Sequence, residues 1–168
     1  MRTDEALLWA IGQADRAAFQ ELYDRHADRV YRFALSFVRN GPLAEEVLQE
    51  TMLAVWKQAD KFWGSSKATT WILGIARNQA HGLLRREKRG ERLPEESTFE
   101  ADPAEVAEID VRVKQALESL SSEHQEALHL VFYEEMSLAD AAAVLGIPEG
   151  TVKSRLYYAR KALAKELL

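Results

Sequence analysis

The sequence contains no cysteine, and none of its four histidines has the spacing of a metal ligand. A chain without cysteine has no disulfide framework and no thiolate metal site. Single histidines at such spacings are typical of buried or surface positions and not of ligand sets. We therefore expect no metal ion and no other cofactor.

Long apolar runs are also missing. No stretch approaches the roughly 20 apolar residues that a membrane-spanning helix needs. The N-terminal segment MRTDEALLWAIGQADR carries acidic residues within its apolar run, which is unlike a signal peptide. These absences predict a cytoplasmic protein that is not inserted in a membrane.

Catalytic signatures are absent from the sequence as well. It has no phosphate-binding glycine loop and no recognisable nucleophile and base motif. We therefore predict no catalytic residues and a protein that is not an enzyme. An enzyme with an all-helical pocket is an alternative, although no acid, base or metal cluster stands out to serve it.

The charge that is present is unevenly distributed. The formal net charge is -5, yet basic residues prevail between Lys61 and Arg92. The following stretch, LPEESTFEADPAEVAEID (93–110), carries acids only, together with two prolines. This composition predicts an acidic flexible linker between two domains, residues 1–92 and 111–168, and it fits a passive tether as well as a functional segment.

Apolar residues recur at steps of three and four through most of the rest of the chain, which predicts an all-α fold. In the first domain this period predicts helices over residues 17–40, 42–62 and roughly 68–88. At 168 residues and 47% hydrophobic content, the chain can bury one moderate core or two small ones. The sequence thus predicts two small helical domains.

The C-terminal segment SLADAAAVLGIPEGTVKSRLYYARKAL predicts a helix-turn-helix. Ser137 is a good N-cap, Gly146 ends the first helix after Leu145, and Pro148 suits the start of the second. Opposite the apolar stripe, the second helix presents hydroxyl, cationic and aromatic side chains, which are typical of DNA-reading surfaces. The alternative is a helical hairpin whose charged face is only solvated.

Four motifs in order resemble the bacterial RNA polymerase sigma factors of the compact extracytoplasmic-function (ECF) group. They are AFQELYDRHADRVYRFA, AEEVLQETMLAVW, TWILGIARNQAHGLLRR and MSLADAAAVLGIPEGTVKSRLYYARKAL. The resemblance implies a sigma-2 helical bundle in residues 1–92 and a sigma-4 helix-turn-helix domain in residues 111–168. It also implies a protein that binds core RNA polymerase, recognises the minus-10 and minus-35 promoter elements and initiates transcription.

The resemblance also implies three sets of binding residues and an anti-sigma factor as a further partner. Core polymerase is expected to contact the exposed face of the second helix: Glu46, Gln49, Glu50 and Leu53. Minus-10 DNA and strand opening are expected to involve Phe62, Trp63, Lys67, Asn78, Arg85 and Arg86. Minus-35 DNA is expected to be read by Thr151, Lys153, Ser154, Arg155, Tyr157 and Tyr158.

Some of these residues also have simpler interpretations. Without the resemblance, the polar face of the second helix is an ordinary solvated surface, and the basic run from Arg85 is a solvated helix end. The main alternative for the whole chain is a stand-alone helix-turn-helix transcriptional regulator that binds duplex DNA by itself. Tight operator binding by the purified protein would favour it.

Overall fold

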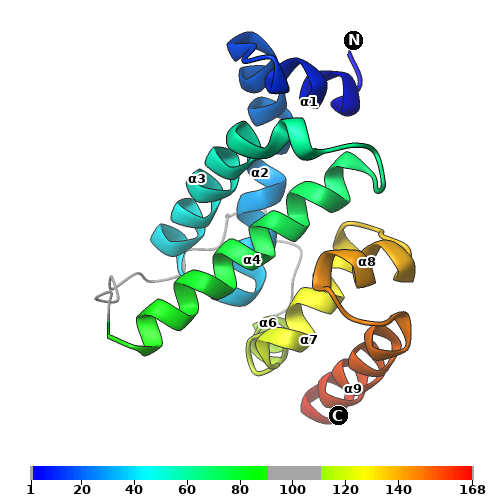
Figure 1. Cartoon of the computed structure of the whole chain (residues 1–168). Helices are drawn as coiled ribbons and strands as arrows, with labels where there is room; N and C mark the ends of the chain where they lie inside the picture. The colour runs from blue at the N-terminus through cyan, green and yellow to red at the C-terminus, as the bar shows by residue number, and fades with distance from the viewer. Residues whose placement is uncertain (1, 91–110, 168) are drawn as a thin grey trace.

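The computed structural model describes residues 2–90 and 111–167, so the predicted acidic linker (93–110) lies outside the described residues. Figure 1 shows an all-helical chain, and no strand occurs in these two ranges. None of the helices described is long and apolar enough to cross a membrane. We refer to residues 2–90 as the N-terminal half and to residues 111–167 as the C-terminal half.

The N-terminal half is a bundle of four helices, which can be traced in chain order in Figure 1. Local capping explains where the first three begin: the side chains of Thr3, Asp15 and Asn40 each accept a hydrogen bond from a backbone N–H in the first turn. The elements are α1 (Asp4–Gly12), α2 (Arg16–Val38), α3 (Gly41–Gln58), the 3₁₀ turn η1 (Ala59–Lys61) and α4 (Ala68–Lys88).

The C-terminal half contains the predicted helix-turn-helix. The Ser137 hydroxyl accepts from the backbone N–H of Asp140, and Gly146 ends the first helix at a φ of 67°, where glycine is not strained. The predicted bounds of that helix are confirmed. The elements are α6 (Val111–Glu118), α7 (Ser122–Leu128), the π-helical turn η2 (His129–Tyr133), α8 (Leu138–Leu145) and α9 (Glu149–Leu167).

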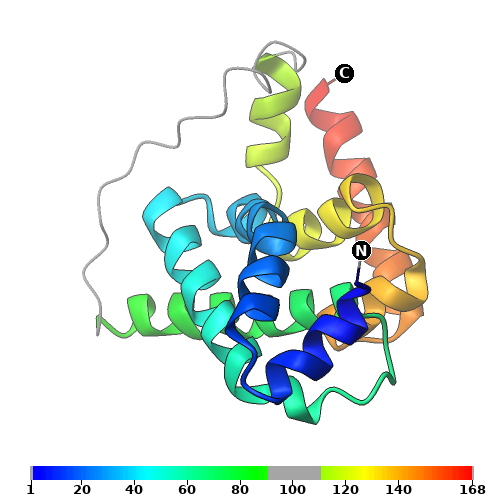
Figure 2. The ribbon, with the colours of Figure 1, turned by 90° about the horizontal axis from the view of Figure 1, so that it is seen from above.

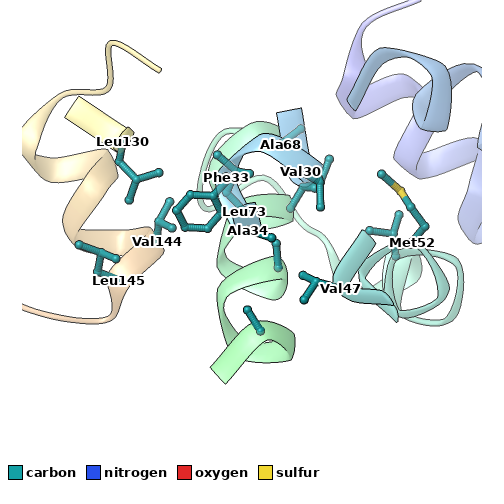
Figure 3. Packing of buried hydrophobic residues seen from close by; sticks show 14 of the residues in the cluster. Val30, Phe33, Ala34, Val47, Met52, Ala68, Leu73, Leu130, Val144 and Leu145 are labelled. Atoms are coloured by element: carbon teal, nitrogen blue, oxygen red, sulfur yellow. The ribbon is translucent and has the colours of Figure 1, made fainter. Parts of the chain in front are cut away.

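The two halves share one continuous apolar core, which the sequence did not predict. In Figure 3, Leu130 and Val144 of the C-terminal half lie on one side of Phe33, while Val47 of α3 lies beyond it. Phe33 and Leu130 are both fully buried. Figure 2 shows the C-terminal half lying against one side of the bundle, where α7 packs on α2 and α8 packs on α4.

His129 lies at this shared core. Its ring is 5.7 Å from that of Phe33 and stacks on Tyr133 at 4.6 Å, measured between centroids. Its Nε2 is buried and has no hydrogen-bond partner among the residues described. Burial, with a smaller contribution from the positive charge of Arg32, lowers the pKa of His129 from 6.5 to about 4.

This pKa predicts that the protein loses stability in mild acid. Between pH 6.5 and about 4 the unfolded chain binds a proton at His129 that the folded protein does not. The stability that depends on a neutral His129 is therefore complete above pH 6.5. It is lost as the pH falls, and the free energy of unfolding decreases by up to about 1.4 kcal/mol per pH unit. Urea unfolding of the full chain across this window should show the slope, and His129→Gln should reduce it.

His124→Gln is the matched control because it removes another histidine of the same domain. It should leave the acid slope close to that of the wild-type protein. An unchanged slope in His129→Gln would contradict the burial of a neutral His129.

Candidate polymerase and nucleic-acid interfaces

Helix α3 presents the residues expected to bind core polymerase. Its inward side buries Val47, and Gln49, Glu50 and Leu53 are exposed while Glu46 is half-buried. Leu53 is a large apolar side chain with 45% of its surface exposed. An exposed leucine between acidic and amide side chains is a feature of protein-binding surfaces, although a single one is common on any protein.

A groove of about 420 Å³ lies between α2 and α3 beside these residues. Sequence reasoning did not single out its α2 wall, which includes Tyr23, Asp28 and Tyr31. The lining residues are Tyr23, Ala27, Asp28, Tyr31, Glu45, Leu48 and Gln49. The groove therefore adjoins the face that is expected to bind polymerase, and it shares Gln49 with it.

The loop between η1 and α4 holds two aromatic residues in different environments. Trp63 is 83% exposed, whereas Phe62 is half-buried and packs on Trp71 with ring centroids 5.3 Å apart. Phe62 therefore packs within the protein, which was not expected when it was assigned to the DNA contacts. Trp63 is the ring in this loop that is available for stacking on a base.

The remaining residues of the minus-10 set lie on or next to α4. Asn78, Arg85 and Arg86 are exposed. Lys67, directly before α4, is also largely exposed, and its Nζ lies 3.0 Å from Oδ2 of Asp140 on α8. In this structure a lysine expected to contact DNA is thus paired with a carboxylate of the C-terminal half.

Helix α9 is the second helix of the helix-turn-helix, and its buried side is formed by Val152, Leu156 and Ala159. The opposite side exposes Tyr157 and Tyr158 by 61% and 57%, with their rings edge to face at 5.3 Å. Large exposed aromatics are costly to hydrate, so their adjacent placement favours a binding surface.

The other members of the minus-35 set differ in how available they are. Lys153 and Ser154 are exposed, and the Ser154 hydroxyl donates to the Gly150 carbonyl at 3.1 Å. Thr151 and Arg155 are half-buried, and Nη1 of Arg155 is buried without a partner among the described residues. The exposed members of the expected minus-35 set are therefore Lys153, Ser154, Tyr157 and Tyr158.

Sequence reasoning missed the charged residues that join the two halves. Glu126 of α7 has no exposed side-chain surface, and its Oε2 lies 3.0 Å from Nε of Arg77 and 3.3 Å from Nε2 of His81, both on α4. In sequence Glu126 looks like a solvent-facing residue of an amphipathic helix. Its burial follows from the packing of the halves, which no local pattern in the sequence reveals.

Arg39 makes a second connection of this kind. Its backbone adopts a left-handed conformation (φ 56°) that ends α2, and its Nη2 donates to the carbonyls of Leu117 and Leu120 at 3.1 and 3.3 Å. Its Nε donates to Oε1 of Gln125 at 3.2 Å. Burial lowers the pKa of Arg39, partly offset by the negative charge of Glu118.

Comparison with known proteins shows which families the two halves match. Residues 22–90 match the family Sigma-70 region 2, and residues 110–163 match the family Sigma-70, region 4. The ECF RNA polymerase sigma factor SigL of Mycobacterium tuberculosis is 35% identical over 163 residues, covering 89% of each chain. RpoE of Cereibacter sphaeroides, also an ECF sigma factor, is 32% identical and covers 99% of this chain and 96% of its own.

Solved structures show the same similarity. The sigma factor RpoE of Bartonella quintana, solved in complex with the anti-sigma factor NepR, has a TM-score of 0.76 and is 30% identical, with 89% of this chain and 96% of that chain covered. CnrH, solved with the cytosolic domain of CnrY, has a TM-score of 0.74 at 27% identity, covering 98% and 96%.

A region 2 bundle followed by a region 4 helix-turn-helix defines a sigma factor of the sigma-70 type, a protein of promoter-directed transcription initiation. Within that class the chain belongs to the ECF group of RNA polymerase sigma factors. Proteins of this kind are generally initiation factors without catalysis of their own.

The contrast between the two loop aromatics gives a test of strand opening. Trp63→Ala should change the free energy of unfolding by less than about 0.5 kcal/mol, because the ring is exposed. It should nevertheless reduce promoter opening roughly tenfold, since stacking on a base is worth about 1–3 kcal/mol. Permanganate reactivity of unpaired thymines, with core polymerase present, measures the opening.

Trp9→Ala is the control for this test, because Trp9 on α1 is also largely exposed (71%) and belongs to none of the expected DNA contacts. It should leave opening unchanged. Phe62→Ala should lower both stability and opening. Normal opening in Trp63→Ala would remove this ring from the strand-opening site.

Proposed function

We propose that this ECF sigma factor uses three separate surfaces, each of which binds a different partner or promoter element. The exposed face of α3 (Glu46, Gln49, Glu50 and Leu53) binds core RNA polymerase. The loop before α4 together with α4 holds the opened minus-10 strand, through Phe62, Trp63, Lys67, Asn78, Arg85 and Arg86. The outer face of α9 reads the minus-35 element through Thr151, Lys153, Ser154, Arg155, Tyr157 and Tyr158.

The observation that supports this division most directly is the exposure of large aromatics at both expected DNA surfaces. Trp63, Tyr157 and Tyr158 are each more than half exposed, and none is needed to fill the core. Bases stack on such rings, and thymine methyl groups contact them in the major groove. Lys153 on α9 and the arginines near the end of α4 add the positive charge that phosphates attract.

The same proposal covers the partners and the location of the protein. Two sigma factors with this fold have been solved in complexes, one of them with an anti-sigma factor. We expect an anti-sigma factor for this chain too, because its fold matches theirs over most of its length. We also expect it to act in the cytoplasm, where core polymerase and promoters are found, and to have no enzymatic activity.

The polymerase-binding surface is tested by Leu53→Arg. Leu53 is exposed, so the substitution should leave the fold intact, whereas a cation in the centre of the interface should weaken core binding at least roughly tenfold. Co-elution of the full chain with core polymerase measures this. Gln58→Arg, which adds the same charge at an exposed position of α3 outside the set, should bind normally.

Promoter reading is tested by Lys153→Ala in run-off transcription with core polymerase on a pool of genomic fragments. Loss of one base contact costs about 1–3 kcal/mol, so selection of minus-35 sequences should relax roughly tenfold at one position. Lys165→Ala, near the far end of α9, should retain selection. No polymerase-dependent transcription from the wild-type protein would refute the proposed function.

A stand-alone regulator would behave differently in a simple binding experiment. One helix-turn-helix module buries only about 600–1,000 Å² on DNA, so without polymerase this chain should bind duplexes weakly. Nanomolar, sequence-specific binding by the full chain at physiological salt would favour the regulator instead.

A further inference from the structure

Helix α1 approaches the chain immediately before the loop of residues 62–67, which we call the opening loop. Its last residue, Gly12, faces Asp60 of η1, and a Cβ at Gly12 would lie 3.3 Å from the Cα of Asp60 and 3.4 Å from its backbone nitrogen. A larger residue there would push η1 away, because backbone atoms cannot turn aside as the end of a flexible side chain can. Helix propensity favours almost any other residue over glycine, so the glycine at position 12 is explained by this close approach.

The other end of α1 is connected to the chain just after the opening loop by a row of hydrogen bonds. Oδ2 of Asp4 lies 3.0 Å from Nε2 of His26, and Nη1 of Arg29 lies 3.4 Å from Nδ1 of that histidine. The same Nη1 donates at 3.2 Å to Oγ1 of Thr69, the second residue of α4. The row therefore runs from the first turn of α1, across α2, to the first turn of α4.

His26 is the buried link in this row, with 2% of its surface exposed. A guanidinium can only donate, so Nδ1 of His26 accepts from Arg29 and the Nε2–H donates to Asp4. Burial is the largest cause of the lowered pKa of His26, and the charge of Asp4 opposes it. The ring is thus neutral and joins a donor on one side to an acceptor on the other.

Helix α1 is itself fixed firmly to the bundle. Leu7 and Leu8 are fully buried. In the turn to α2, Ala14 has a φ of 65°, a strained left-handed conformation that persists only where the surrounding structure holds the chain in place. Figure 1 shows α1 lying across the end of the bundle at which α3 turns back into α4. The match to Sigma-70 region 2 begins only at residue 22, after this helix.

We propose that α1 positions the opening loop by holding both of its ends. Gly12 fixes the chain before the loop, and Asp4, acting through His26 and Arg29, fixes the chain after it. Gly12 and Asp4 are positioning residues, because neither belongs to the expected DNA contacts. The step from loop position to promoter opening rests on the proposed function, which assigns Trp63 and its neighbours to the opened strand.

The first test measures the position of the opening loop without polymerase or DNA. The chain has no cysteine, so spin labels on Asp24→Cys of α2 and Ser65→Cys of the loop, both at exposed positions, report one distance distribution by double electron–electron resonance. Gly12→Val should shift or broaden this distribution, because the added side chain displaces η1. Ala6→Val, which places the same residue at an exposed position of α1, should leave it unchanged.

Asp4→Ala tests the other end of the loop and does not depend on how Gly12→Val folds. It should broaden the same distribution, because His26 and Arg29 lose the anchor of their row. Glu5→Ala is the matched control, since it removes the neighbouring exposed acid of the same first turn. If valine prevents folding at position 12, Gly12→Ala takes its place. An unchanged distribution at either end would overturn the proposal.

The second test measures promoter opening by permanganate reactivity with core polymerase present. Gly12→Val and Asp4→Ala should slow opening about tenfold and about threefold, because a displaced ring loses part of its contact with the base. Their co-elution with core polymerase should be unchanged. A loss of stability alone would lower core binding and opening together, so a loss of opening alone identifies a positioning role.

Trp63→Ala, measured beside these variants, separates the proposal from the proposed function. Normal opening in Gly12→Val and Asp4→Ala, with slow opening in Trp63→Ala, would overturn the proposal. Normal opening in all three would instead refute the assignment of the loop to strand opening, and the label distances would still decide whether α1 holds the loop.

Discussion

Helix α2 has to bury two faces at once, and the rest of the structure depends on this constraint. One face packs on α1, α3 and α4 to complete the bundle, and the other receives α7 and η2. Phe33 lies at this second contact, where its ring meets that of His129, and the ring of Phe37 one turn further on stacks on that of His81 of α4. The C-terminal half is therefore held through the same 23-residue helix that organises the N-terminal half.

Burial at the contact between the halves shifts the pKa values of several residues there. Burial is the largest cause of the lowered pKa of Arg39 and His129 and of the raised pKa of Glu134, where the charge of Arg29 opposes it. In each case burial favours the neutral form. Charged pairs persist in this environment because partners of opposite sign face each other, and apolar packing supplies the adhesion.

The helices themselves followed closely from the sequence, because their boundaries are set by neighbours along the chain. Ser137 and Gly146 delimit α8 through contacts within four residues, and the predicted 68–88 helix is confirmed as α4. The short helix α1 was not predicted, since its nine residues give little periodicity. Its position depends on tertiary pairs such as Asp4 with Arg25 and His26.

The candidate sites were predictable to the extent that they depend on helix faces. Periodicity alone places Leu53, Tyr157 and Tyr158 on outer faces, and the structure exposes all three. It does not reveal that Phe62 packs on Trp71 or that Arg155 turns partly inward, because both depend on the neighbouring side chains. The pairing of Lys67 with Asp140 joins residues 73 positions apart, which is beyond any local pattern.

The contacts of Arg39 limit how freely region 2 and region 4 can be exchanged between related sigma factors. Its guanidinium ends α6 by binding the carbonyls of Leu117 and Leu120, so a residue of region 2 completes a helix of region 4. The regions match separate families and look like interchangeable modules, yet Arg39 of region 2 binds at the end of α6, and ion pairs such as Arg77 with Glu126 join the two regions. A chimera that takes region 4 from another sigma factor would leave the half-buried Arg39 without these acceptors unless the donor helix ended at the same place. Grafts that exchange α6 and α7 together with the facing residues of α2 and α4 would avoid this mismatch.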